Sequence, residues 1–361
     1  MAPLSGIRIV EIDAIGPVPF AAMLLAGMGA AIVRIARPGG QAAFDDLGET
    51  IIHRGRSGIT LDLKSTEGRE SALKLIGEAD ALLEGFRPGV MERLGLGPEA
   101  CLAVNPKLVF ARMTGWGQTG LLAARAGHDI NYIALSGALA AIGEEGRPPS
   151  PPLNLVGDYG GGAMFLVSGV LAAIIEAQRT GRGQVVDVAM VDGAISLMSM
   201  FLALRQNGHW SDRREDNLLD GGAPFYRCYA CSDGRYVAVG AIEPPFFRAL
   251  LDGLGFAPDA FRQHDRTQWP AMTAAFAERL ATRSRDEWAA HFGDTDACVT
   301  PVLDMLEAAR HPHNVARAAH IELDGILHPT PAPRFADMPT LHPARVETVE
   351  QVLARWGKPR N

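Results

Sequence analysis

The sequence has few cysteines, no basic cluster and no apolar run long enough to cross a bilayer. Four cysteines in 361 residues do not make a disulfide scaffold, so we expect a reduced protein. The formal net charge is −7, whereas general nucleic-acid binders cluster lysine and arginine to neutralise phosphates. The longest apolar run, residues 163–175, stops at Glu176 and predicts a buried helix. The first residues lack the basic stretch of a signal peptide. We therefore expect a cytoplasmic protein with no nucleic-acid partner and no membrane partner.

Common cofactor and metal motifs are missing as well. The segment after the first predicted strand reads DAIGPVPF in place of GxGxxG, and GxxxxGK[ST] does not occur, so no dinucleotide or P-loop site is predicted. Cys228 and Cys231 lie in a predicted hairpin, where residues three apart point to opposite faces. These two thiols therefore do not converge on a metal, and we expect no metal site and no redox centre.

Short β-branched runs alternate with helical patterns through the first half of the chain. Strands are predicted at residues 7–12, 31–35, 59–63, 81–83 and 107–113. Helices are predicted from residue 20 to Gly27 or Gly29 and over 65–79, with Ser65 as the cap. This alternation predicts an α/β fold with a Rossmann-like parallel sheet covered by helices. Ligands of such sheets bind beyond the carboxyl ends of the strands. Arg37, Lys64 and Arg87 fall at or just after such ends.

The chain is longer than one hydrophobic core usually serves, so we expect two domains. A polar, turn-rich segment follows the last long helix of the first half, and this composition is typical of a linker. The predicted division is a large α/β domain at 1–205, a linker at 206–222, a small α+β domain at 223–300, a second linker at 301–330 and a segment at 331–361 that returns to the large domain.

Two motifs place titratable side chains where a helix is predicted to begin. AGHDINYIALSG, residues 126–137, contains His128 and Asp129, and VGDYGGG, residues 156–162, contains Asp158. Taken singly, the two aspartates have a structural explanation as N-caps and His128 as a turn residue. Taken together, they offer a pair of proton-transfer groups. The free amides at the second helix mouth are also suited to stabilise an enolate oxygen.

The whole pattern resembles the α-methylacyl-CoA racemases of the family III CoA-transferase superfamily. The resemblance covers nearly the full length and rests on ordered segments, among them PLSGIRIVEI, EGFRPGVMERLGLGPE, ARMTGWGQTG, AGHDINYIALSG, PPLNLVGDYGGG, GQVVDVAMVDG and DGRYVAVGAIEPPFF. It implies an interlocked homodimer in which CoA lies on the large domain and a small domain closes the acyl cleft. CoA is then part of the substrate, and no separate cofactor is expected.

The resemblance also implies functional residues. The proton-transfer residues are His128 and Asp158, and Glu243 of the GAIEP motif pairs with the histidine. The implied CoA contacts are Arg37, Leu61, Asp62, Leu63, Lys64, Gly85, Phe86, Arg87, Arg93, Gly127, Asp129, Ile130, Asn131 and Tyr132.

The chemistry requires two acid/base groups that flank the carbon next to a thioester. One group removes a proton from one face while the other returns a proton to the opposite face, through an enolate. The resemblance favours a racemase over a transferase, because family transferases commonly carry an aromatic residue at the position of His128. Two alternatives stay open: a family III CoA-transferase with Asp158 as nucleophile, and a non-catalytic CoA-binding protein. The acyl group is not defined by the sequence.

Overall fold

The computed structural model describes residues 1–39 and 49–357 and divides the chain into two compact units. Unit 1 comprises Met1–Ala138, Pro152–Ser199 and Ala318–Asn361, and unit 2 comprises Leu139–Pro151 and Met200–Arg317. The predicted boundaries differ from this division at several places, since residues 200–205 and the stretches 206–222 and 301–317, predicted as large domain and linkers, fall in unit 2. Residues 139–151 go with unit 2, and residues 318–330 belong to unit 1 rather than to a linker. The last four residues of the predicted segment 331–361 lie outside the described residues.

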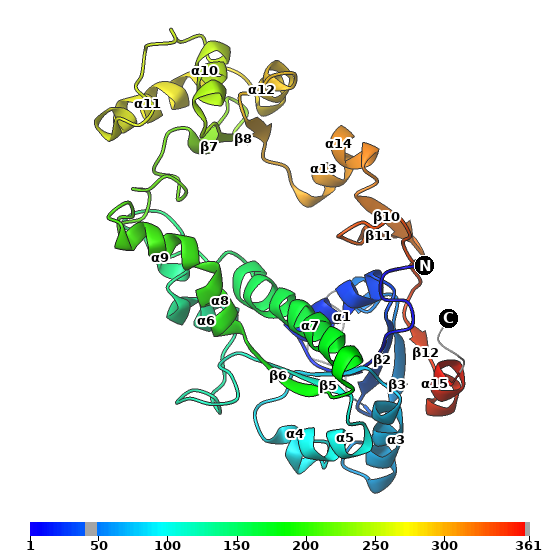
Figure 1. Cartoon of the computed structure of the whole chain (residues 1–361). Helices are drawn as coiled ribbons and strands as arrows, with labels where there is room; N and C mark the ends of the chain where they lie inside the picture. The colour runs from blue at the N-terminus through cyan, green and yellow to red at the C-terminus, as the bar shows by residue number, and fades with distance from the viewer. Residues whose placement is uncertain (40–48, 358–361) are drawn as a thin grey trace. The chain divides into compact units, whose positions relative to one another are not determined.

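A seven-stranded parallel sheet forms the centre of unit 1, with the order β12-β3-β2-β1-β4-β5-β6 (Figure 1). All of its strand pairs are parallel, so the carboxyl ends of the strands meet at one edge. The strands are β1 Arg8–Ile12, β2 Ala31–Ala36, β3 Ser57–Thr60, β4 Ala81–Glu84, β5 Val109–Thr114, β6 Gln184–Ala189 and β12 Arg345–Val346. The predicted parallel α/β sheet is thereby confirmed.

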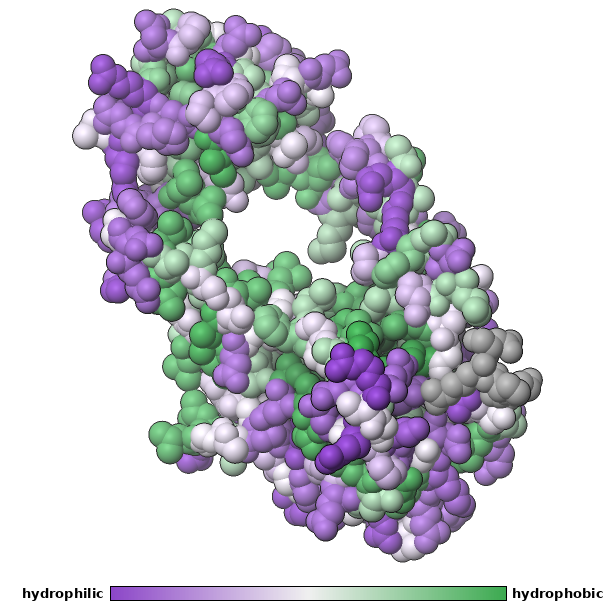
Figure 2. Space-filling model, in the orientation of Figure 1, coloured by the Kyte–Doolittle hydropathy of each residue, from purple (hydrophilic) through white to green (hydrophobic). Residues whose placement is uncertain are grey.

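Helices cover both faces of this sheet because its strands are apolar on both sides. On one face α1 (Pro17–Gly27) and α7 (Met164–Thr180) pack into a core with Ile9, Val109 and their neighbours. On the other face lie α3 (Thr66–Gly77), α5 (Pro98–Val104) and α15 (Val349–Trp356). Figure 2 shows that the outer surface over α3 and α5 is largely hydrophilic, as expected of amphipathic helices.

The helix predicted from the apolar run 163–175 is confirmed, and it extends beyond that run in both directions. A π-helix, η2 (Leu155–Ala163), leads directly into α7. The combined helix Leu155–Thr180 is long and apolar enough by composition to cross a membrane, yet half of its most apolar window is buried in the protein. We therefore describe it as a core helix. Close packing against α8 (Met190–Leu197) explains two glycines of η2, since a Cβ on Gly161 would lie 2.7 Å from the Ala194 amide nitrogen and one on Gly162 would lie 2.9 Å from Met190 Cγ.

Unit 2 has a three-stranded antiparallel sheet with the order β7-β8-β9. The predicted hairpin is confirmed as β7 Tyr226–Ala230 and β8 Tyr236–Gly240, and β9 Val299–Pro301 adds a third strand that was not predicted. Helices α10 Pro244–Gly253, α11 Trp269–Leu280 and α12 Arg285–Phe292 supply the core on one face. Cys228 is exposed and Cys231 is buried, so the two thiols lie on opposite faces as predicted.

The remaining elements are short. In unit 1 they are α2 Glu49–Ile52, α4 Val90–Arg93, α6 Asp129–Ser136 and the hairpin of β10 His320–Leu323 and β11 Ile326–Pro329. In unit 2 they are the 3-10 turns Leu139–Ala141 and Arg266–Gln268, and helices α13 Met305–Arg310 and α14 Pro312–Ala316. Helix α9, Ser199–Gln206, begins at the end of one unit and runs into the other.

Candidate active site

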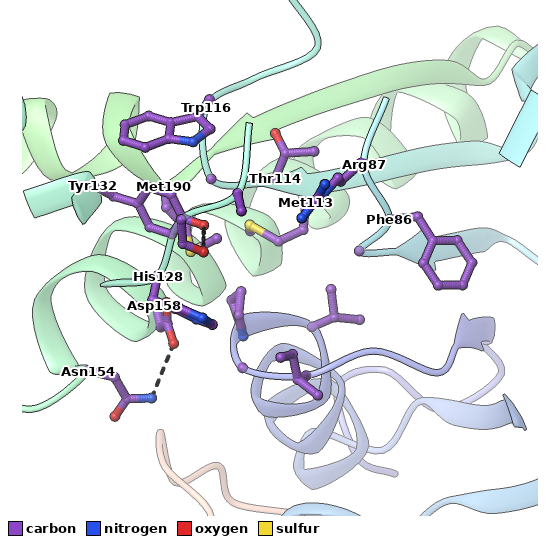
Figure 3. Close-up of a pocket in the computed structure, with 18 of the residues that line it drawn as sticks. Phe86, Arg87, Met113, Thr114, Trp116, His128, Tyr132, Asn154, Asp158 and Met190 are labelled. Atoms are coloured by element: carbon purple, nitrogen blue, oxygen red, sulfur yellow. Dashed lines mark hydrogen bonds between the residues drawn. The ribbon is translucent and has the colours of Figure 1, made fainter. Parts of the chain in front are cut away.

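A cavity of about 580 Å³ opens in unit 1 at the carboxyl edge of the parallel sheet. The segments after β1, β4, β5 and β6 contribute to its wall, together with the first residues of α6 and part of η2. Figure 3 shows His128, Asp158 and Asn154 on one side of it and Phe86 and Arg87 on another. This is where an open parallel sheet usually binds its ligand.

His128 stands at the N-terminus of α6 and lines the cavity. It is the N-cap residue of this helix, and Asp129 is the first helical residue, so the N-cap assignment of Asp129 is wrong. The His128 backbone N–H donates to Asn131 Oδ1 at 3.0 Å. That hydrogen bond involves only the backbone of His128, and its exposed imidazole lines the cavity.

Asp158 also lines the cavity, but it is not an N-cap either. It lies within the π-helix η2, whose N-cap is Asn154, and π-helical turns frequently mark functional sites. Asn154 Nδ2 donates to Asp158 Oδ2 at 3.3 Å (Figure 3). Burial raises the pKa of Asp158 above its usual value and the Asp129 carboxylate adds to the rise, while Asn154 and His128 oppose it.

A glycine of the GPVP segment gives the Asp158 carboxylate its room. Gly16 precedes α1 with φ +73°, and a Cβ built on it would lie 3.1 Å from Asp158 Oδ2. Any larger residue would therefore crowd the carboxylate and strain the backbone at this left-handed position.

Asp129 links the N-terminus of α6 to the first turn of η2. Its side chain is buried, and Oδ2 accepts hydrogen bonds from the amides of Gly157 and Asp158, both at 2.7 Å. The amides at this second helix start were predicted as a group to suit an enolate oxygen. Two of them, the amides of Gly157 and Asp158, are not available for that role because the Asp129 carboxylate already accepts both. The amides of Asp129 and Ile130 in the first turn of α6 have no acceptor within residues 1–39 and 49–357, as is common in a first helical turn.

Tyr132 is wedged between two glycines at the back of the cavity. A Cβ on Gly115 would lie 2.1 Å from its ring and one on Gly127 would lie 2.7 Å away. The hydroxyl donates to the Gly127 carbonyl, and the ring packs edge-on against Trp116 with centroids 4.7 Å apart. Burial raises the pKa of Tyr132 to about 12, so this residue stays a neutral donor.

The structure brings some of the predicted CoA residues together with His128 and Asp158 but not all of them. Gly85, Phe86, Arg87, Gly127 and Tyr132 line the cavity. Arg37 follows β2 and Leu61, Asp62, Leu63 and Lys64 follow β3, so they lie along the same carboxyl edge without lining the cavity. Arg93 ends α4, and Ile130 and Asn131 are exposed on α6. The side chain of Asp129 is buried and bonded to the backbone of η2.

Glu243 belongs to unit 2, where it is the exposed N-cap of α10. Its pairing with His128 stays a prediction.

Several cavity residues were missed at the sequence level. Asn154, Gly16, Trp116, Arg125 and Tyr159 all line the cavity. Tyr159 stacks on Phe20 of α1 with ring centroids 4.0 Å apart. The adjacency of Asn154 and Asp158 at a four-residue spacing was the one available signal. Within the described part of the chain, no group of three or more His, Cys, Asp or Glu side chains forms a metal cluster.

The chain is similar to known proteins along nearly its whole length. A family model described as CoA-transferase family III matches residues 4–359. The α-methylacyl-CoA racemase of Mus musculus is 45% identical, covering 98% of this chain and 93% of its own length, and that of Homo sapiens is 42% identical with the same coverage. The crystal structure of a CAIB/BAIF family protein from Brucella suis aligns with a TM-score of 0.83 at 25% identity, over 98% of this chain and 99% of its own. These matches include both units.

Proposed function

Because the chain belongs to CoA-transferase family III, we propose that it is an α-methylacyl-CoA racemase, an isomerase that interconverts (R)- and (S)-2-methylacyl-CoA thioesters. The observation that carries the proposal is that His128 and Asp158 line one cavity from two different helical segments. The two relatives named as racemases support the same activity.

The proposed mechanism is a 1,1-proton transfer between two bases. One of the pair His128 and Asp158 removes the α-proton, and the other protonates the opposite face of the enolate. Free imidazole and carboxylate have reference pKa values of about 6.5 and 3.9, a gap of roughly 3.5 kcal/mol in water. The raised pKa of Asp158 narrows this gap, so that both protonation states are within reach in a reversible reaction.

The enolate oxygen needs a donor that the protein has not already used. The amides of Asp129 and Ile130 have no acceptor among the described residues, and they lie at the positive end of α6 next to His128. We assign the thioester oxygen to this helix mouth. The amides of Gly157 and Asp158 then serve the packing of η2 through Asp129.

CoA itself is the remote handle that positions the acyl centre. The proposed contacts at the carboxyl edge run from Lys64 and Arg37 to Arg87 and Tyr132. No separate cofactor is part of the proposal, and the acyl group is open. The proposed assembly is an interlocked homodimer in the cytoplasm, in which Glu243 orients the His128 imidazole, without nucleic-acid or membrane partners.

Racemisation is tested with (S)-2-methylacyl-CoA and a free carboxylate acceptor in deuterated water, followed by chiral analysis. Epimerisation with deuterium at the α-carbon and no CoA exchange supports the proposal. A new acyl-CoA made from the acceptor, with the stereocentre untouched, would show a CoA-transferase with Asp158 as nucleophile. Binding of CoA with neither reaction would show a non-catalytic CoA-binding protein.

The two-base assignment has its own test. Loss of one general acid/base should slow racemisation by roughly 10²–10⁴-fold. In deuterated water His128→Ala and Asp158→Asn should each exchange the α-proton of one enantiomer only, with retention, and the two variants should choose opposite enantiomers. If both variants exchange the same enantiomer, the assignment of one base to each face is wrong.

The role of Glu243 is tested by mixing subunits. His128→Ala and Glu243→Ala proteins are combined under conditions that exchange protomers. Recovered activity means that Glu243 is supplied by the partner chain. No recovery in confirmed heterodimers means that all three residues act within one chain.

A further inference from the structure

The segment between β4 and the end of α4 contains two arginines that make no ion pair within the described ranges. Arg87 lines the cavity, and Arg93 is the last residue of α4. Gly89 turns the chain between them with φ +81°, and Arg93 Nη1 lies 3.1 Å from the Cβ position of Gly89. Two exposed guanidinium groups therefore belong to one short segment, residues 87–93, and such groups suit an anionic ligand such as a phosphate.

A single buried guanidinium is bonded to both ends of this segment. Arg112 of β5 is 6% exposed. Its Nε donates to Glu84 Oε1 at 2.8 Å, at the start of the segment. Its Nη1 and Nη2 donate to the two oxygens of Glu92 at 2.7 and 3.2 Å, at the other end. Glu84 Oε2 in turn accepts the amide of Phe86 at 2.7 Å.

These bonds fix the backbone and separate the charges. Glu84 is fully buried, and its contact with the Phe86 amide fixes the chain one residue before Arg87. The Glu92 carboxylate is adjacent in sequence to Arg93, yet it is held by Arg112, and this hydrogen bonding lowers the pKa of Glu92. The Glu92 carboxylate is therefore engaged by Arg112 and not by its neighbour Arg93.

We propose that Arg112 is a positioning residue for CoA binding, which acts by clamping both ends of residues 84–93 so that Arg87 and Arg93 are held ready for the phosphates. The proposal rests on the proposed function, since CoA is the anion in question. The clamp needs arginine because one planar guanidinium group donates all three hydrogen bonds, to Glu84 and to Glu92. A lysine ammonium at this site would reach one carboxylate at a time.

The test measures binding of free CoA by calorimetry and the steady-state kinetics of racemisation. Arg112→Lys and Glu92→Ala should each raise the Kd for CoA and the KM for acyl-CoA about tenfold. This is less than the roughly 10²-fold loss of rate that follows from misplacing a substrate by about 1 Å. The kcat at saturating substrate should change less than twofold. Glu92→Gln, which keeps an acceptor oxygen, should recover part of the affinity.

Glu78→Ala is the matched control. Glu78 pairs with Arg8 of β1 at 3.4 Å, and its side chain is 55% exposed compared with 45% for Glu92, but Arg8 begins its strand at the amino edge of the sheet, away from the cavity. This variant should leave the Kd for CoA unchanged.

A double-mutant cycle distinguishes positioning from general stability. In a background that carries both Arg87→Ala and Arg93→Ala the effect of Glu92→Ala on the Kd should shrink, because these two arginines are the groups through which the clamp acts. Full additivity, or a Kd within twofold of the wild type in folded Arg112→Lys and Glu92→Ala, overturns the proposal. Wild-type protein that binds CoA without racemising its thioesters overturns the proposed function alone, since the clamp is measured by CoA affinity.

Discussion

The bond between Asp129 and the backbone of η2 makes a sharp prediction about stability. Asp129→Ala leaves the amides of Gly157 and Asp158 without their acceptor at 2.7 Å. A buried N–H donor without an acceptor costs about 1–3 kcal/mol. The amide of Asp158 is only partly buried, so we expect the two donors together to lower the free energy of unfolding by about 3 kcal/mol. For a unit of this size that lowers the Tm by roughly 6–12 °C.

Asp129→Asn separates the hydrogen bonds from the charge. The amide oxygen can still accept both bonds, and a neutral acceptor keeps about half of the strength, so the cost should be about 1–1.5 kcal/mol. Burial is the main cause of the raised pKa of Asp158, and the Asn variant removes the negative charge that adds to this rise. The pH at which Asp158 begins to act as a base should therefore move to a lower value in the pH profile of the α-proton exchange.

The measurement is urea unfolding followed by circular dichroism, with Asp304→Ala as the control. Oδ1 of Asp304 accepts two amides at 2.9 and 2.8 Å in the same manner, but this side chain is an exposed N-cap. Its loss should cost about 1 kcal/mol. The argument fails if Asp129→Ala costs no more than Asp304→Ala, or if Asp129→Asn is as damaging as Asp129→Ala.

Three further predictions concern the site and its pH dependence. Asp158→Asn should unfold at higher urea than the wild type at neutral pH, because the raised pKa of Asp158 means that its ionised form opposes folding; the gain should vanish as the pH falls through that pKa. Gly16→Ala should cost about 1–2 kcal/mol and reduce racemisation, since its Cβ lies 3.1 Å from Asp158 Oδ2 and φ is +73°; unchanged kinetics would contradict this. Burial, aided by Arg56, lowers the pKa of His53 to about 3, so the free energy of unfolding should decrease as the pH falls from about 6.5 to about 3. His53→Gln should flatten this part of the pH–stability curve. An unchanged slope would show that His53 is not the group responsible.

The parallel sheet was predictable because most of its strands are short, apolar and flanked by turns. β1, β2, β4 and β5 fall close to the predicted ranges, whereas β3 ends at Thr60 and not at residue 63. The edge strand β6, QVVDVA, was missed because Asp187 interrupts its valines and leaves no continuous apolar run. β12 has only two residues, which is too short for any periodic pattern.

The site residues were predictable, but their roles in the local structure were not. His128 and Asp158 stand out as titratable groups near glycines, and both line the cavity. The bond of Asp129 to residues 157 and 158 spans 28 and 29 positions, and no local pattern predicts such a pairing. The π-helix was not foreseen, because LVGDYGGG has no periodicity that separates a widened turn from a loop.

The strand β12 has a consequence for the order in which the chain is made. It pairs with β3 through Arg345↔Ser57 and Val346↔Gly58, so it covers a sheet edge that was synthesised almost 300 residues earlier. Until that point the backbone groups of β3 on this side face no partner strand, and an open strand edge is prone to pair with other chains. Unit 2 lies between these two events in the sequence. A ribosome-bound chain therefore carries an unfinished sheet edge through the synthesis of an entire second unit, and this interval is when the nascent protein most needs protection from aggregation.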